Sequence, residues 1–149
     1  MYQLKRVQFI NTDLEGAWNF FSNPANLKVI TPPYLGFEVK TELPQKMYPG
    51  LFINYKVSPL FGLKINWTTE ITHVNELRFF VDEQRVGPYR IWHHEHHFIE
   101  KNGGVEMTDI VSYQLPFGFL GRILHPIIIA PKLEEIFAFR INKVDEIFV

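Results

Sequence analysis

The chain has 149 residues, of which 46% are hydrophobic and 21% charged, as in an ordinary globular domain and unlike a disordered chain. Its formal net charge of −1 lacks the surplus of Lys and Arg that phosphate binding requires, so we expect no nucleic-acid partner. The absence of cysteine excludes disulfides and thiol chemistry, and is typical of a reducing cytoplasm.

No segment suggests export or insertion into a membrane. The start, Met1-Tyr-Gln-Leu-Lys-Arg, lacks the apolar run of a signal peptide. The longest aliphatic run, residues 127–130, is bracketed by Pro126 and Pro131 and is too short to cross a bilayer. Without repeats or linkers, residues 1–149 are expected to form one cytoplasmic domain with no transmembrane segment.

The first predicted elements are a strand and a short helix. Residues 2–10 have the texture of a strand. The sequence Thr12-Asp-Leu-Glu15 matches a capping box, with Thr12 as N-cap and Glu15 reaching back to it. Apolar residues then recur at helical spacing until Ser22-Asn-Pro24, and a further short turn of helix is expected over residues 25–30.

Short strands separated by turns occupy the middle of the chain. The predicted strands are residues 37–43, 51–57, 64–72, 78–86, 89–100 and 105–113. No helical pattern separates them, which indicates an antiparallel meander.

The period changes to that of a helix after Pro131. One stripe of this helix is apolar and includes a single arginine: Leu133, Ile136, Phe137, Arg140, Ile141, Val144 and Phe148. The apolar face of the sheet must be covered, and this is the only long helix predicted. One helix is too narrow to fill a curved sheet, so we expect a cavity between them.

Several motifs, in this order, resemble those of the START-like, birch-pollen-allergen-like (SRPBCC) superfamily, and especially its small, mostly bacterial polyketide cyclase/dehydrase and lipid-transport-like branch. They are Trp18, Ile30-Thr-Pro-Pro33, Tyr48-Pro-Gly50, Trp67, Phe80-Val-Asp-Glu-Gln84, Gly87-Pro88, Trp92-x-His94-x-His96-x-Phe98, Asp109-x-Val-x-Tyr113, Pro116-Phe-Gly118 and Ile136-Phe137…Arg140. The resemblance implies an α+β helix-grip fold, in which a curved antiparallel sheet wraps around a long C-terminal helix and short helices follow the first strand. It also implies an apolar ligand under that helix, and it identifies no reaction.

A hairpin over residues 89–113 organises the candidate site. Asn102-Gly103 favours a type I′ turn, because both central residues of that turn need positive φ. This turn places Trp92, His94, His96 and Phe98 opposite Tyr113, Val111, Asp109 and Met107 on one face of the sheet. His93 and His97 then lie on the other face.

His94, His96 and Asp109 allow four interpretations. They form a self-satisfied buried polar trio, they contact the polar group of a ligand, they perform acid–base chemistry as a histidine–carboxylate pair, or they bind a metal. Asp109 lies opposite His96, where it is placed to hydrogen-bond the imidazole rather than to bind a metal ion itself. No further histidine is placed to act as a third metal ligand. The sequence therefore predicts no metal site and no cofactor.

The expected ligand-binding residues combine this face with the helix and one neighbouring strand: Trp67, Trp92, His94, His96, Phe98, Met107, Asp109, Val111, Tyr113, Phe137 and Arg140. Core packing is the alternative, favoured for Phe98 and Met107, whereas the hydroxyl of Tyr113 favours ligand contact.

Arg140 needs an anion, and an internal partner is favoured over a ligand; the candidates are Asp82, Glu83 and Asp109. A plain two-residue turn at Gly87-Pro88 directs Glu83 into the site, whereas a bulge directs Asp82 there, so the facing of residues 78–86 stays open.

Two loops, residues 58–62 and 116–121, carry bulky apolar side chains, among them Phe61 and Phe119. If exposed, these loops gate the cavity or touch a membrane transiently; if buried, they close the core.

The sequence thus predicts binding of a small hydrophobic molecule, such as a lipid, a polyketide-like or an aromatic compound. The alternatives are a cyclase, dehydratase or hydrolase using His96 and Asp109, or a structural or partner-binding protein whose core fills the cavity.

Overall fold

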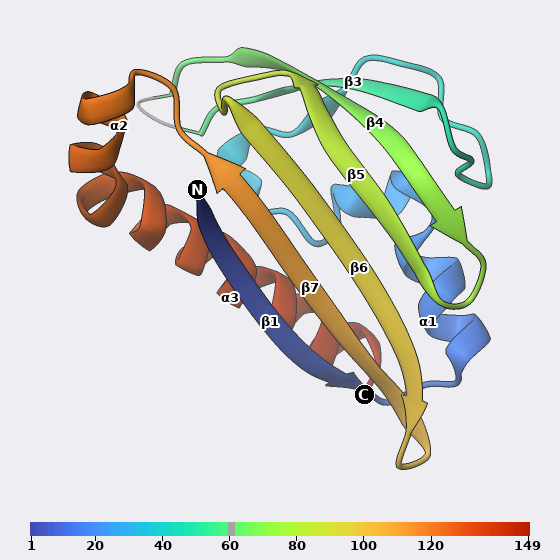
Figure 1. Ribbon diagram of the computed structural model, residues 1–149. Coiled ribbons are helices and arrows are strands. Elements are labelled where there is room, and N and C mark those ends of the chain that lie inside the picture. Colours follow the sequence, from blue (N-terminus) through green and yellow to red (C-terminus); the bar gives the residue numbers. More distant parts are fainter. Residues whose placement is uncertain (60–61) are drawn as a thin grey trace.

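A seven-stranded antiparallel sheet curves around the C-terminal helix in the computed structural model, which describes residues 1–59 and 62–149 (Figure 1). The strands are β1 (Tyr2–Ile10), β2 (Glu38–Val39), β3 (Leu51–Val57), β4 (Ile65–Asn75), β5 (Phe79–Val86), β6 (Ile91–Lys101) and β7 (Gly104–Gln114). Their order in the sheet is β1-β7-β6-β5-β4-β3-β2. Consecutive strands from β2 to β7 are therefore neighbours, which confirms the expected meander and the α+β helix-grip fold.

The helices lie together on one side of this sheet (Figure 1). They are α1 (Leu14–Phe21), the 3-10 segments η1 (Pro24–Leu27) and η2 (Pro33–Leu35), α2 (Gly118–Leu124) and α3 (Ala130–Ile147). A π-helical segment, η3 (His125–Ile129), joins α2 to α3. The stripe expected on the last helix is buried at Leu133, Phe137, Arg140 and Val144.

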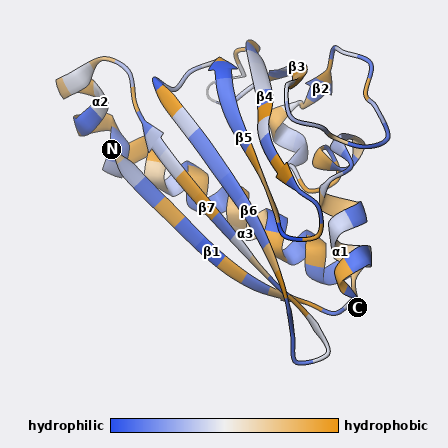
Figure 2. Ribbon diagram, turned by 45° about the vertical axis from the view of Figure 1, so that its right-hand side comes forward, coloured by the Kyte–Doolittle hydropathy of each residue, from blue (hydrophilic) through white to orange (hydrophobic). Residues whose placement is uncertain are grey.

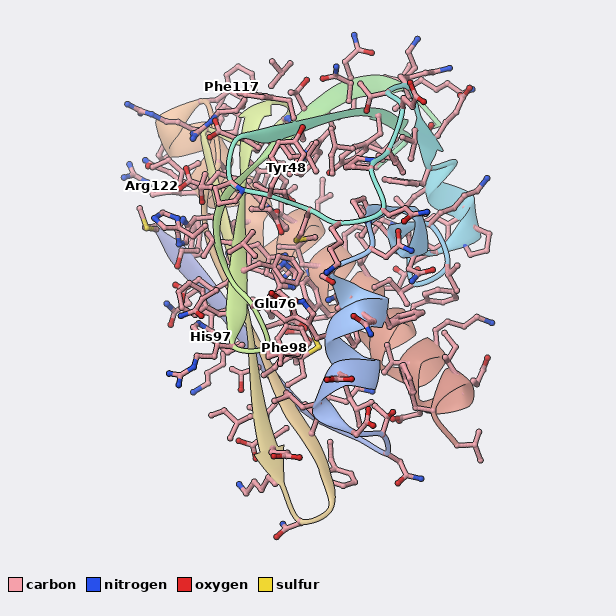
Figure 3. The ribbon with its side chains drawn as sticks, turned by 90° about the vertical axis from the view of Figure 1, so that its right-hand side faces the viewer. Tyr48, Glu76, His97, Phe98, Phe117 and Arg122 are labelled. Carbon is pink, nitrogen blue, oxygen red and sulfur yellow. The ribbon has the colours of Figure 1, made fainter. Side chains whose placement is uncertain are left out.

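The central hairpin has the register expected from its turn. Asn102 and Gly103 both have positive φ, and Trp92, His94, His96 and Phe98 pair with Tyr113, Val111, Asp109 and Met107. Burial alternates along β6 and β7, so these side chains share the inner face. Hydrophobic and hydrophilic residues also alternate along β1 (Figure 2), but there the hydrophobic Val7 and Phe9 are exposed. In Figure 3, His97 and its neighbour Phe98 accordingly point to opposite sides of β6.

The largest core cluster lies near the hairpin turn, where α1 packs on β6 and β7. Trp18 of α1 meets Phe80 and Phe98 edge to face, with ring centroids 5.9 and 5.5 Å apart. Met107 and Val144 close the cluster from β7 and α3, with 1% of their surface exposed. Side chains fill the space between sheet and helix next to the hairpin turn, while Phe21, Ile30 and Phe80 of the same cluster border the open space farther along.

Three local predictions differ from the structure. Asp13, not Thr12, caps α1, because its carboxylate accepts the backbone N–H of Gly16. The strand expected over residues 37–43 shrinks to β2, since only Glu38 and Val39 pair with β3. The loop expected around Phe119 is the helix α2. Phe61, in the other apolar loop, lies outside the described residues.

Candidate functional site: a cavity with a histidine–aspartate cluster

A cavity of about 410 Å³ lies between the sheet, the first helical segments and α3. Its wall is mostly apolar and takes side chains from distant parts of the chain, among them Phe21, Ile30, Val39, Ile53, Val57, Trp67, Ile71, Trp92, Leu133 and Phe137. The polar side chains are gathered mainly on the central strands and α3: Thr69, Asp82, His94, His96 and Arg140. The site is therefore an apolar chamber with one polar wall.

Aromatic side chains of β3, β4 and β6 form the wall on the side away from α1. The rings of Trp67 and Trp92 meet edge to face at 5.6 Å, and that of Tyr89 lies 4.7 Å from Trp92. Thr69 holds two of these rings, since its hydroxyl accepts the indole N–H of Trp67 at 3.1 Å and bonds the hydroxyl of Tyr55 at 3.2 Å. With these polar atoms already paired, the rings present apolar surface to the cavity.

Two histidines of β6 stand between two carboxylates on the neighbouring strands. His94 Nε2 lies 2.9 Å from Asp109 Oδ1 of β7, and its Nδ1 lies 3.8 Å from Asp82 Oδ2 of β5. His96 has the opposite arrangement, with Nε2 2.7 Å from Asp82 Oδ2 and Nδ1 3.1 Å from Asp109 Oδ1. We call these four side chains the His–Asp cluster. Both imidazoles are buried.

Arg140 reaches the cluster from α3. Its NH2 nitrogen lies 3.4 Å from Asp109 Oδ1, and the guanidinium packs over the ring of Phe21 at 5.4 Å. The internal partner expected for this arginine is therefore Asp109. Among the described residues, no buried side-chain nitrogen or oxygen lacks a hydrogen-bonding partner.

Burial and charge act on the pKa of each member of the cluster. Burial alone raises the pKa of Asp109, but the charge of Arg140 and hydrogen bonds with His94 and His96 hold it well below its usual value. The pKa of Asp82 is likewise lowered, against its burial, by the hydrogen bond with His96 and the charge of His94. Both aspartates are thus carboxylates at neutral pH.

The two histidines separate in pKa although they are neighbours. Burial and the charge of His96 lower the pKa of His94. Burial acts on His96 too, but hydrogen bonds with Asp109 and Asp82 outweigh it and raise its pKa. Two carboxylates face one guanidinium, so the cluster and Arg140 together carry a single negative charge while both imidazoles are neutral, and no net charge once His96 is protonated. In neither state does the site carry the net positive charge that would favour an anion.

The described fold matches solved structures over nearly its whole length, although the sequences are distant. Protein Ms6760 from Mycobacterium smegmatis aligns with 97% of this chain and 89% of its own, at a TM-score of 0.71 and 21% identity. Protein CV1439 from Chromobacterium violaceum aligns over 99% and 98%, at 0.74 and 10% identity. The major latex-like protein 151 of Panax ginseng aligns over 99% and 97%, at 0.67 and 11% identity.

This chain has a helix-grip fold, which it shares with these solved structures. The fold expected from the sequence motifs therefore agrees with the three-dimensional structure. The sequence matches no protein-family model and no curated protein. Among the described residues, no helix is both long and apolar enough to cross a membrane.

Within this helix-grip fold, the residues selected from the sequence fall into two groups. Six line the cavity: Trp67, Trp92, His94, His96, Phe137 and Arg140. Phe98, Met107, Asp109, Val111 and Tyr113 share the inner face but lie outside the cavity lining.

These five have other contacts that account for their burial. Phe98 and Met107 pack with Trp18 of α1, and Val111 packs with Leu4 and Phe137. The hydroxyl of Tyr113 bonds His125 Nε2 at 2.6 Å, and the imidazole of His125 stacks on Tyr2 at 3.5 Å. Tyr113 of β7 and Tyr2 of the edge strand β1 therefore hold His125, the first residue of η3, against the sheet.

The structure adds cavity residues that the sequence left open or missed. Asp82 faces the cavity, because it pairs with His94 and Glu83 with His93, one residue away from the register of a plain two-residue turn. The loop before β6 is closed by Gln84, whose side-chain amide bonds both the carbonyl and the N–H of Tyr89 at 2.6 and 3.0 Å. This contact holds Tyr89 in the cavity wall. Two signals in the sequence pointed to Asp82: the alternative facing of β5, and its place among the candidate partners of Arg140.

Proposed function

We propose that residues 1–149 act as one domain that binds a small, largely hydrophobic molecule in the cavity between the sheet and α3. The observation that carries this proposal is the cavity itself. Its volume of about 410 Å³ falls in the range of small-molecule sites, about 300–1,000 Å³, and apolar side chains dominate its wall. A protein whose own rings fill the core has no such space.

The His–Asp cluster narrows the class of ligand. Arg140 already faces Asp109, so a carboxylate on the ligand gains little from this guanidinium and meets Asp82 as a like charge. A hydroxyl, a carbonyl or an amide avoids that repulsion and hydrogen-bonds the imidazoles. The proposed ligand is therefore an uncharged aromatic or polyketide-like compound, or a lipid alcohol, with one or two polar oxygens.

Two measurements test this proposal. Native mass spectrometry of protein purified from its own host is expected to show an added mass that dissociates as an uncharged organic molecule. In a second assay, the uncharged probe N-phenyl-1-naphthylamine is expected to gain fluorescence on binding. The substitution Ile53→Phe, which adds a ring inside the cavity, should abolish this gain, whereas Ile99→Phe, on the exposed face of β6, should leave it unchanged.

Equal probe binding by the Ile53→Phe and Ile99→Phe variants would contradict the proposal, because the probe would then bind outside the cavity. Circular dichroism is required as a check on folding. Ile53 borders free space, so the added ring should not unfold the sheet.

Catalysis is the second candidate, and one observation favours it. His96 faces the cavity and lies within 3.1 Å of both carboxylates, which orient its imidazole as in proton-transfer sites. Incubation of the co-purified compound with the protein separates the two candidates. A carrier leaves the compound unchanged, and His96→Gln keeps binding. An enzyme converts the compound, and His96→Gln abolishes the conversion.

The helix α2 offers a way for such a ligand to arrive. Phe117, Gly121 and Leu124 line the cavity, while Phe119, Leu120 and Ile127 are more than half exposed. Exposed apolar side chains in this number mark a contact surface on a protein of this size. We include transient contact of α2 with a membrane surface in the proposal.

A further inference from the structure

We propose that Asp82, His94 and His96 form a binding site for a divalent transition-metal ion at the polar wall of the cavity. These three side chains bring ligand atoms within 4.8 Å of one another. Two imidazoles and one carboxylate are the ligand set that proteins use for Zn²⁺ or Fe²⁺ where other coordination positions stay open. The proposal does not depend on the organic ligand of the cavity.

The hydrogen bonds of the two imidazoles differ at the nitrogens that would bind a metal. His94 Nε2 donates to Asp109 Oδ1 at 2.9 Å, so in the neutral imidazole Nδ1 is a lone pair on the side of Asp82. His96 Nε2 hydrogen-bonds Asp82 Oδ2 at 2.7 Å, and the NH2 nitrogen of Arg140 lies 3.5 Å from His96 Nδ1. A metal ion bound to His96 Nε2 therefore takes the place of the proton on that nitrogen.

Asp82 Oδ2 lies between the two histidines. It accepts the N–H of His96 Nε2 at 2.7 Å, whereas His94 Nδ1 lies 3.8 Å away, beyond hydrogen-bonding distance. A metal ion bound by all three side chains also engages His94 Nδ1, which the proton on His96 does not.

The spacing suits a metal ion with little rearrangement. Ligand atoms at about 2.1 Å from a common ion are about 3.0–3.4 Å apart in octahedral or tetrahedral arrangements. The two separations from Asp82 Oδ2, 2.7 and 3.8 Å, lie on either side of this range, and the two imidazole nitrogens lie within 4.8 Å of each other. Side-chain shifts of about 1 Å therefore bring the three ligand atoms to a common ion.

Asp109 and Arg140 hold the histidine ligands in place without binding the ion themselves. Asp109 fixes the orientation of both imidazoles, and Arg140 holds Asp109 from α3 at 3.4 Å. Asp82, His94 and His96 all line the cavity, whereas Asp109 does not. The open coordination positions therefore face the cavity, where an oxygen of a bound molecule can occupy one of them. There the ion polarises that oxygen as a Lewis acid.

The charge balance agrees with this assignment. With neutral imidazoles the cluster and Arg140 carry a single negative charge, and a divalent ion converts it to a single positive charge.

Equilibrium dialysis of chelator-treated protein against Zn²⁺, with bound metal counted by mass spectrometry, tests the site directly. One zinc per chain is expected for the unchanged protein. His94→Gln, His96→Gln and Asp82→Asn should lose it. His93→Gln and His97→Gln are matched controls, because they change the other two histidines of the same strand on its outer face, and they should keep it.

Asp109→Asn should weaken zinc binding by about 10–100-fold without removing a ligand. With Co²⁺ in place of Zn²⁺, the protein should gain a visible absorption band that disappears in the same three variants.

Three results would overturn the assignment: no zinc on the unchanged protein, retention of one zinc by the His94 and His96 variants, or loss of it in the His93 and His97 variants. The third outcome places the ion on the outer face with Glu83 and Glu95. Circular dichroism shows whether each variant is folded. If a histidine variant unfolds, zinc binding by the near-isosteric Asp82→Asn variant decides the question, and retention of one zinc by that variant contradicts the assignment. The dialysis contains no organic ligand, so its failure leaves the proposed binding function standing.

Discussion

Removing either partner of the Asp109–Arg140 pair should destabilise the protein strongly, and removing both should cost less than the sum. The two charged atoms lie 3.4 Å apart, and about a tenth of each side chain is exposed. At that distance, with an effective dielectric constant of about 20, their attraction is about 5 kcal/mol. Loss of one partner from such a buried pair costs about 3–5 kcal/mol, because the other charge stays buried.

Arg140→Met and Asp109→Asn are the suitable single changes. Met keeps the aliphatic packing against Phe21, and Asn keeps the size and the hydrogen-bonding oxygen of Asp109. The hydrogen bonds from His94 and His96 still reach Asp109 in the Met variant, so its loss should lie near the lower limit, about 3 kcal/mol. The double variant should recover about 2 kcal/mol relative to the sum of the single losses.

Urea unfolding at 25 °C and pH 7, followed by tryptophan fluorescence, measures the four free energies of this cycle. The exposed pair Lys143–Glu146, 3.1 Å apart on the surface of α3, is a matched control whose coupling should stay below about 0.5 kcal/mol. Additive losses at Asp109 and Arg140, or a coupling no larger than that of the surface pair, would refute the account of Arg140 as the structural partner of Asp109.

Three further predictions concern the frame of the site. Asp13→Ala should lower the free energy of unfolding by about 1 kcal/mol in urea titrations, and Thr12→Ala by less than half of that, because only Asp13 caps α1. Equal losses would instead support the predicted capping box with Thr12 as the N-cap. Gly104→Ala should cost about 1–3 kcal/mol, read as a lower melting temperature, because its new methyl group would meet the Phe9 ring and lie 2.6 Å from the carbonyl oxygen of Ile10; an unchanged melting temperature contradicts this. Phe119→Asp and Ile127→Asp should reduce sedimentation with liposomes, whereas Ile99→Asp on the far side of β6 should not; if the unchanged protein does not sediment, the membrane contact is wrong.

The parts of the fold that the sequence predicted correctly depend on short-range rules. The Asn102-Gly103 turn fixes the pairing of β6 with β7, because a two-residue turn allows one register and one facing for every side chain on both strands. The spacing of Leu133, Phe137, Arg140 and Val144 likewise determines which side of α3 is buried. Each of these needs only neighbours in the chain.

Elements that depend on distant packing could not be predicted in the same way. The apolar residues around Phe119 were expected in a loop because glycine and proline flank them, yet they form α2, which runs through η3 into α3. The hydroxyl of Tyr113 was expected to contact a ligand, because its strand faces the cavity side of the sheet. In the structure this hydroxyl bonds His125, which lies in the helical segments after β7. The hydrogen-bonding partner of a buried hydroxyl depends on which side chains pack next to it in three dimensions. Sequence patterns do not predict which of several possible partners that will be.

The facing of β5 decides between the two simplest interpretations of the His–Asp cluster. With Glu83 inside, His94 and His96 have only Asp109, and a closed hydrogen-bonded trio satisfies them. With Asp82 inside, a second carboxylate hydrogen-bonds His96 Nε2 at 2.7 Å and lies 3.8 Å from His94 Nδ1, so three possible metal ligands face one another. One residue of register, set by the loop that Gln84 closes, thus changes a structural cluster into a candidate binding site. For this reason Asp82→Asn is the most informative single substitution. It keeps the shape of the cluster and removes the charge of one of the three candidate ligands.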